Sequence, residues 1–314
     1  MVTGVELGKI MNNNSLMNHK FKSGFVALIG RPNVGKSSLF NNFIGQKITI
    51  TSEKPQTTRN SLRGILTTED YQIVWVDTPG LHRPLHRLGD QMNRAAQLVL
   101  PDVDLILWVL DSSAGFTPAD QKVADVLKET TTPVFVLWNK DDLVADDNEP
   151  PQIGAFERQF RVSAQTGRGI PQLLAAIADQ LPVGPAFYPP DQITDHPERF
   201  IAAEFLREKV LQFTQDEVPH AIAVQVEEMK ERSNGRIYIE ATLYVERDSQ
   251  KGIIIGAGGE RLKSIGKAAR EDLELLLDAP VFLNLWVKVR KNWRNHEASL
   301  KEFGYWDDTR NRDR

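Results

Sequence analysis

Residues 25–44 read FVALIGRPNVGKSSLFNNFI, and this stretch decides the fold. An apolar run of strand length leads into the pattern G-x-x-x-x-G-K-S at 30–37, and a helical pattern follows it. In that order, backbone N–H groups of the loop and the N-terminus of the helix can surround phosphate groups. A chance glycine-rich turn is the alternative for the pattern alone. The residues predicted to hold the phosphates are Gly30, Arg31, Pro32, Asn33, Val34, Gly35, Lys36, Ser37 and Ser38.

Alternating apolar and helical segments continue from this stretch to residue 182. Further apolar runs lie at 73–76, 105–110, 134–138 and, more weakly, 160–162, and helix-length segments lie at 36–43, 89–100, 118–128 and 170–181. Buried strands that alternate with helices are typical of a mostly parallel sheet with crossover helices. We therefore expect an α/β domain over residues 23–182, preceded by a polar, Asn-rich flexible leader at 1–22.

Composition limits the classes of protein to which the chain can belong. The 314 residues suggest two domains, each long enough to bury its own core, and the net charge of −4 gives no general reason to expect nucleic-acid binding. The absence of cysteine excludes disulfides and Cys-ligated metal sites. No apolar run approaches the ~18 residues that cross a bilayer, and no signal peptide is recognised. We expect a cytoplasmic protein, in which any nucleic-acid site is a local patch.

The motif Asp77-Thr78-Pro79-Gly80 follows the apolar run at 73–76. An Asp in this position can hold Mg²⁺ through water, and the Gly80 N–H can approach a γ-phosphate. Ser37 offers a hydroxyl to the same ion, and Lys36 reaches the β- and γ-phosphates. By itself the motif is also an ordinary turn, so its weight comes from its place after the phosphate-binding loop.

Two motifs farther along predict which base the site prefers. Asn139-Lys140-Asp141-Asp142 follows the run at 134–138, and the Asp142 carboxylate can pair with the two neighbouring N–H donors of guanine. Adenine offers no such pair, so the carboxylate would lose its partners. Ser163-Ala164 follows the last weak run and can present a backbone N–H to guanine O6. Each motif ends a predicted strand, at the edge where open α/β sheets bind ligands.

A second domain begins after a proline-rich linker at 183–197. Residues 198–294 predict the order helix, strand, strand, helix, helix, strand, which is an α+β arrangement. Asn234-Gly235 lies between the first two strands and predicts a tight hairpin turn with positive φ values. Residues 295–314 remain as a C-terminal tail.

Between the two middle helices the chain reads Ile253-Ile254-Ile255-Gly256-Ala257-Gly258-Gly259, which matches the I-I-G-x-x-G of a KH domain. KH loops clamp about four nucleotides of single-stranded RNA. Residues 251–294 carry nine Lys or Arg against five acids. A solvated helix face behind a turn is the alternative. The predicted RNA contacts are Lys251, Gly256, Ala257, Gly258, Gly259, Arg261, Lys263, Lys267 and Arg270.

The nucleotide motifs resemble those of the translation-factor-type P-loop GTPases, which share the Ras-like fold. The resemblance implies GTP or GDP with Mg²⁺ as ligands, and it implies that Gln56-Thr57-Thr58-Arg59 belongs to a switch in which Thr58 closes on Mg²⁺. The implied metal ligands are therefore Ser37, Thr58 and Asp77. Leu81 stands where Ras-like enzymes carry a water-orienting glutamine, and leucine cannot orient water. GTPases with that departure can carry an asparagine at the position of Asn33. By this resemblance, Asn33 is a ligand for a monovalent cation such as K⁺. The implied catalytic residues are Lys36, Thr58, Gly80 and Asn33.

One GTPase domain followed directly by a type II KH domain is the layout of the Era GTPase family. GRPNVGKSSL, QTTR, DTPG, NKDD, SAQTG and IIGAGG carry this resemblance, which spans about residues 22–306. It implies a monomeric, GTP-hydrolysing factor that binds the 3′ end of 16S ribosomal RNA and the small ribosomal subunit during maturation. Peripheral membrane association stays open for the family, although no strongly basic amphipathic helix supports it. The alternatives are a tRNA-modifying or membrane-transport GTPase, which lacks a downstream GxxG domain, and an RNA-binding module that binds GTP without turnover.

Overall fold

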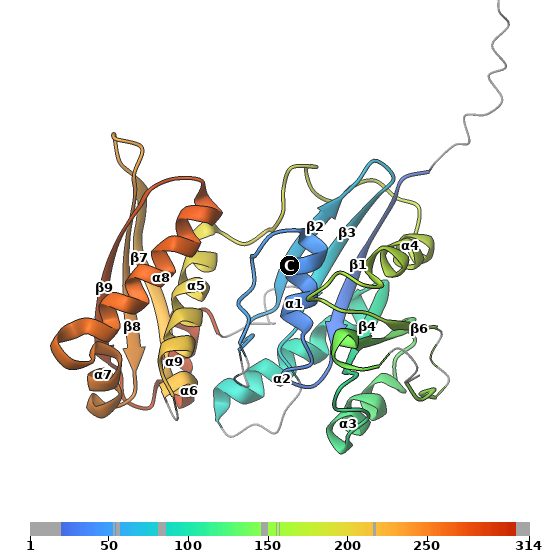
Figure 1. The fold of residues 1–314 in the computed structure, drawn as a ribbon, viewed down its shortest axis with the longest axis horizontal. Coiled ribbons are helices and arrows are strands. Elements are labelled where there is room, and N and C mark those ends of the chain that lie inside the picture. The colour runs from blue at the N-terminus through green and yellow to red at the C-terminus, as the bar shows by residue number, and fades with distance from the viewer. Residues whose placement is uncertain are drawn as a thin grey trace, which may run out of the picture.

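The first domain is built on one six-stranded sheet with the strand order β2-β3-β1-β4-β5-β6 (Figure 1). The computed structural model describes residues 20–305 except 53, 55–56, 81–85, 146–149, 155, 157 and 216–217, without the side chains of 95–97, 99 and 219–220. Only β2 runs antiparallel to its neighbour among the paired strands of this sheet in the described residues, so the prediction of a mostly parallel sheet is confirmed. The strands are β1 (Lys22–Ile29), β2 (Leu62–Thr67), β3 (Tyr71–Asp77), β4 (Leu105–Asp111), β5 (Val134–Asn139) and β6 (Arg158–Arg161).

Helices cover both faces of this sheet, as expected for parallel strands that are buried on both sides. The helices are α1 (Lys36–Ile44), α2 (Arg87–Val99), α3 (Pro118–Leu127) and α4 (Ile170–Gln180). Buried side chains of α1 and α4 belong to one hydrophobic cluster, whereas those of α3 belong to another on the opposite face. The start of α3 is fixed by Pro118 in its first turn and by a capping box between Thr117 and Asp120.

The second domain packs its helices against one face of a three-stranded sheet with the order β7-β8-β9. Strand β8 is antiparallel to β7 and parallel to β9. The predicted α+β order is present, with one short extra helix, α6. The elements are α5 (Glu198–Phe213), α6 (Val218–Ala221), β7 (Ala223–Glu231), β8 (Ile237–Val245), α7 (Asp248–Ile255), α8 (Glu260–Leu277) and β9 (Val281–Val289).

The hairpin between β7 and β8 differs from the predicted turn. Only Gly235 takes a positive φ, of 73°, within the turn, and Asn234 does not. The Gly235 amide donates to the Arg232 carbonyl, and the Arg232 amide donates to the Arg236 carbonyl. The loop is one residue longer than a two-residue turn, so a single left-handed residue is enough to close it.

The linker and the tail both pack on the folded domains. Val183 and Thr194 form isolated bridges with Lys22 and Gly64, and in Figure 1 the linker runs from α4 to α5. A short turn at Trp293–Asn295 leads into the tail, which then forms helix α9 (Glu297–Glu302). The predicted leader lies outside the described residues up to residue 19, and β1 begins at its last residue; the tail from residue 306 also lies outside them.

The hydrophobic cores of the two domains are continuous with each other. One hydrophobic cluster contains residues of the first domain, such as Phe40 and Ile48, together with Phe205 and Leu206 of α5. The two domains therefore share buried apolar surface. No helix in the described part of the chain is both long and apolar enough to cross a bilayer.

Candidate nucleotide and RNA sites

The phosphate-binding loop is held from two directions. Lys36 Nζ donates to the carbonyls of Gly30 and Arg31, each at 3.0 Å. Asn139 Nδ2 donates to the Val34 carbonyl at 2.8 Å. Gly35 has φ 94°, and a Cβ on it would lie 2.2 Å from Asn139 Nδ2. Only glycine fits this approach, so the second glycine of the motif and Asn139 of the distant N-K-x-D motif depend on each other.

Ser37, Thr58 and Asp77 converge, as predicted for ligands of one ion. Ser37 Oγ lies 3.0 Å from both Thr58 Oγ1 and Asp77 Oδ2, and Thr58 Oγ1 lies 3.4 Å from Asp77 Oδ2. The other carboxylate oxygen, Asp77 Oδ1, is buried without a hydrogen-bond partner. Two hydroxyls and one carboxylate with an unsatisfied oxygen fit Mg²⁺, which prefers oxygen ligands and few protein groups. Within the described ranges, no cluster of three His, Asp or Glu side chains offers another metal site.

Lys36 and Asp77 are both buried, and their charges are only partly compensated by the protein. Burial lowers the pKa of Lys36 to about 8, while Asp77 acts to raise it and Arg31 to lower it further. Burial raises the pKa of Asp77 to about 6, against the lowering effects of Lys36 and of hydrogen bonds from Ser37 and Thr58. A phosphate beside Lys36 and a divalent cation beside Asp77 would each favour the charged form. The site is thus electrostatically suited to a metal–phosphate pair.

The base-recognition motifs also meet. Ser163 Oγ donates to Asp142 Oδ1 at 2.5 Å, and the Ala164 amide donates to Asn139 Oδ1 at 3.1 Å. A guanine oxygen at Ala164 would therefore share this amide with Asn139. Lys140, with φ 63°, directs its ammonium to Asp111 Oδ2 at 2.6 Å. The two motifs lie at the ends of β5 and β6, which places the predicted guanine contacts in one corner of the site.

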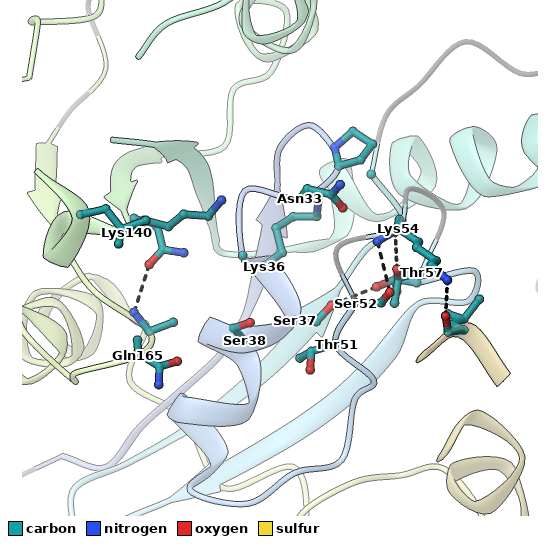
Figure 2. A pocket seen from close by; sticks show the side chains of 18 of the residues that line it. Asn33, Lys36, Ser37, Ser38, Thr51, Ser52, Lys54, Thr57, Lys140 and Gln165 are labelled. Carbon is teal, nitrogen blue, oxygen red and sulfur yellow. Dashed lines mark hydrogen bonds between the residues drawn. The ribbon is translucent and has the colours of Figure 1, made fainter. Parts of the chain in front are cut away.

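These groups surround a cavity of about 1010 Å³. Figure 2 shows Lys140 and Gln165 at one side, Lys36 and Ser37 in the middle, and Thr57 at the opposite side. The predicted residues that line the cavity are Pro32, Asn33, Gly35, Lys36, Ser37, Ser38, Thr58, Gly80, Asn139, Lys140, Asp142 and Ala164.

The other predicted residues are not among those that line the cavity. The Arg31 side chain pairs with Asp120 at 3.3 Å, and the buried Thr78 hydroxyl donates to the Leu28 carbonyl at 2.7 Å. The remaining predicted residues outside the lining are Gly30, Val34, Asp77, Pro79 and Ser163. Gln56 and Leu81, which the resemblance to GTPases singles out, lie outside the described residues.

Several lining residues were not predicted. Thr51, Ser52 and Lys54 come from the segment 46–61 between α1 and β2, which we call the switch segment, and Leu211 and Gln212 come from α5 of the second domain. Thr51 and Lys54 lie within seven residues of Thr58 in the sequence, and this closeness could have indicated that they also line the cavity. No motif in the sequence indicates that α5 reaches the cavity.

The loop 256–259 has the geometry that a GxxG loop needs. Gly256, Gly258 and Gly259 have φ values of 72°, 58° and 82°. A Cβ on Gly256 would lie 2.8 Å from the Arg261 Cβ, whereas Gly258 and Gly259 have open space around them. The Arg261 guanidinium donates to the Ile253 carbonyl at 2.5 Å. Arg261 therefore ties the two helices across the loop in addition to its predicted RNA contact.

The cations Lys263, Lys267 and Arg270 lie on α8 and are exposed. Each of these three cations has an acid of the same helix within 4.0 Å: Lys263 has Glu260, Lys267 has Glu271 and Arg270 has Glu274. Lys251, on α7, is half-buried. Such exposed pairs are weak, so an approaching phosphate can compete for the cations. The acids nevertheless reduce the net charge that RNA would meet.

Comparison with known proteins finds relatives of both domains. A family model described as a 50S ribosome-binding GTPase matches residues 25–140, and a KH domain model matches residues 217–294. The chain is 38% identical to an Aquifex aeolicus Era variant solved with GDP and aluminium fluoride, and the TM-score is 0.87. The match covers 91% of this chain and 99% of that relative. A second Era structure, solved with MgGDPNP and nucleotides 1506–1542 of 16S ribosomal RNA, is 37% identical, with a TM-score of 0.84 and the same coverage. A Ras-like P-loop GTPase domain and a following KH domain, aligned over nearly the whole of these relatives, place the chain in the Era family of GTPases.

Proposed function

We propose that this chain is a GTP-hydrolysing switch that binds the 3′ end of 16S ribosomal RNA and assists maturation of the small ribosomal subunit. The observation that carries the enzymatic part is the convergence of Ser37, Thr58 and Asp77 beside Lys36. The relatives solved with GDP and with MgGDPNP support the same ligands here.

The protein groups of the cavity bind and orient the nucleotide. Lys36 places a positive charge on the outer phosphates, and backbone N–H groups of the loop 30–38, apart from Pro32, surround the chain of phosphates. Ser37, Thr58 and Asp77 would hold Mg²⁺, directly or through water, and the ion when bound neutralises charge that develops on the phosphates. Asp142 accepts hydrogen bonds from the guanine N–H donors. Asn139 and Lys140 hold the residues around it in place. A Cβ on Gly80 would lie 3.0 Å from the Pro32 backbone nitrogen, so the Gly80 backbone packs closely on the phosphate-binding loop, from where its N–H would face a γ-phosphate.

A monovalent cation is proposed as a further part of the site. Asn33 is exposed, lines the cavity and takes the left-handed conformation, with φ 65°. A cation there would supply charge that other GTPases obtain from an arginine finger.

RNA binding is proposed to use the exposed loop 256–259 and the cations around it. Ala257 and Gly258 are exposed, so a backbone of nucleotides can approach the loop amides closely. The Era relative solved with 16S ribosomal RNA supports this class of ligand. Binding to the whole small subunit, a monomeric state, a cytoplasmic location and peripheral membrane contact are further parts of the proposal.

Turnover assays test the enzymatic part. Parent protein with GTP and Mg²⁺ should release phosphate, and Ser37→Ala, which removes one oxygen from the Ser37–Thr58–Asp77 set, should abolish release while a melting curve shows an intact fold. Repeating the assay with and without RNA addresses the alternative, a module that binds GTP without turnover. Absence of phosphate release under both conditions would decide for that alternative.

A further inference from the structure

We propose that Arg207 and Glu208, on helix α5 of the second domain, are positioning residues for GTP hydrolysis. They hold the switch segment so that Thr58 stays beside Ser37 and Asp77. The proposal rests on the proposed function of the cavity and adds to it that the GTPase site is completed by the RNA-binding domain.

The residues on both sides of Thr58 are held by the second domain. The Arg207 guanidinium donates to the Thr57 carbonyl. The buried Arg59 guanidinium donates to the Ile222 carbonyl at 2.5 Å and lies over the rings of Trp293 and Tyr305, with its Cζ 5.7 and 5.4 Å from their centroids. Thr58 is therefore bracketed by two contacts that the first domain alone does not make.

Glu208 holds the beginning of the switch segment. Its Oε1 accepts the Thr51 amide at 2.8 Å, and its Oε2 accepts Lys47 Nζ at 2.5 Å. Lys47 Nζ also lies 2.6 Å from Asp272 of α8. Burial alone would lower the pKa of Lys47, but the hydrogen bonds that its ammonium donates to Asp272 and Glu208, with the negative charges of these two acids, outweigh burial and raise it. Lys47 thus stays charged between two acids of the second domain.

A third contact lies at the end of α5. Lys54 Nζ donates to the carbonyls of Leu211 and Thr214, where the helix ends and its last carbonyls lack intrahelical partners. A cation is favourable at this end because the helix dipole is negative there. Residues 47, 51, 54, 57 and 59 of the switch segment therefore all contact the second domain.

Burial argues that these contacts serve the switch segment. Arg207 and Glu208 are both 0% exposed, and buried charges are costly unless they are well paired. Arg207 already has an ion pair with Glu204 on its own helix. The same guanidinium nitrogen that pairs with Glu204 also donates to the Thr57 carbonyl. The charge of Arg207 is already balanced by Glu204, so the bond to Thr57 serves the switch segment and not helix α5.

Whether these contacts strengthen or weaken GTP binding follows from the conformation of Thr58. The contacts of Arg207 and Glu208 exist together with Thr58 close to Ser37 and Asp77. Contacts made in one conformation favour ligands that bind that conformation. They should therefore strengthen binding of GTP, which needs Thr58 on Mg²⁺, and leave GDP binding unchanged.

The test uses the full chain with Arg207→Ala, Glu208→Gln and the charge-retaining Arg207→Lys. The matched control is Arg199→Ala, an exposed arginine of the same helix. Steady-state GTP turnover is measured together with the dissociation constants of GDP and of GDPNP, with Mg²⁺ present. Arg207→Ala and Glu208→Gln should each lower kcat and GDPNP affinity by about tenfold to hundredfold, the effect expected for loss of a hydrogen bond to a charged group. GDP affinity should stay at the parent value, and Arg207→Lys should recover part of the loss.

Three results would overturn the proposal. The first is parent-like turnover in both Arg207→Ala and Glu208→Gln. The second is an equal loss of GDP and GDPNP affinity, which would indicate general domain packing. If Arg207→Ala does not fold, the test uses Glu208→Gln alone, together with amide hydrogen exchange over residues 57–60. The third result is then that these amides in Glu208→Gln with GDPNP are as well protected as in the parent protein. A parent protein without turnover would instead contradict the proposed function, and the inference with it.

Discussion

At the scale of single residues, Asn139 links the base side of the nucleotide cavity to its phosphate side. Its amide nitrogen donates to the Val34 carbonyl, and its amide oxygen accepts the Ala164 N–H. One side chain thereby sets the spacing between the loop after β1 and the loop after β6. The polar groups that meet the nucleotide are positioned by the protein's own hydrogen bonds, which reduces the cost of ordering them on binding.

Asp142→Asn tests the choice of base. The exchange replaces a carboxylate that accepts from guanine with an amide that also donates, so we expect GTP affinity to fall by about a hundredfold. Xanthosine triphosphate, whose added carbonyl accepts that donor, should bind the variant better than GTP. Competition titrations with both nucleotides measure this, and unchanged GTP affinity would contradict the assigned role of Asp142.

Asn33 allows a test of the monovalent cation. If its side chain ligates a cation near the phosphates, turnover should be faster in K⁺ than in Na⁺ at equal ionic strength. Asn33→Ala should remove that difference. Because the exchange leaves Lys36 and Ser37 in place, nucleotide binding should survive. A parent rate that does not depend on the cation would leave Asn33 as an ordinary loop residue.

At the scale of elements, α7, the loop 256–259 and α8 form the predicted RNA-binding unit. Changing Ala257 and Gly258 together to Asp places two carboxylates where a phosphate backbone must pass. We expect binding of a short single strand matching the 3′ end of 16S ribosomal RNA to be lost in filter-binding assays. The matched control is Ser233→Asp with Asn234→Asp, which adds the same charge to the β7–β8 hairpin at the opposite end of the domain (Figure 1).

A milder pair of changes measures the contribution of α8. Lys263→Ala with Lys267→Ala should reduce the slope of log K against log salt concentration by about 1.4 in magnitude. This corresponds to two lost phosphate contacts, at roughly 0.7 per contact for single strands. Arg261 is left unchanged because it holds the loop through Ile253. Parent-like RNA affinity in the double Asp variant would show that RNA does not use this loop.

The sequence predicts most elements of the fold, and the exceptions have physical causes. The strand β2 escaped prediction because its pattern is interrupted by Gly64, where a Cβ would lie 2.6 Å from the Phe40 ring of α1. Helix α9 is short and polar, and it depends on burial of Leu300 in a cluster with Trp293. The nucleotide motifs were located because each is local, whereas the contribution of α5 to the cavity arises only from tertiary packing.

At the scale of the whole molecule, the second domain touches the segments that follow two nucleotide motifs. The switch segment meets α5 through the contacts of Arg207 and Glu208. Helix α2, which begins a few residues after the DTPG motif, buries Leu88 and Met92 against Trp293, Leu300, Phe303 and Tyr305. The second domain therefore contacts both the switch segment and α2, and the shared hydrophobic cluster makes independent movement of the domains costly.

We expect nucleotide state and RNA binding to be coupled through these contacts. Coupling between sites is reciprocal and typically amounts to about 5- to 150-fold in affinity. The most direct measurement is the affinity of the full chain for the 16S ribosomal RNA 3′-end strand with GDPNP and with GDP, both with Mg²⁺ and at one salt concentration. Because Thr58 lies beside Ser37 and Asp77 while the domains are in contact, we predict tighter RNA binding with GDPNP. Equal affinity in the two states would contradict the account.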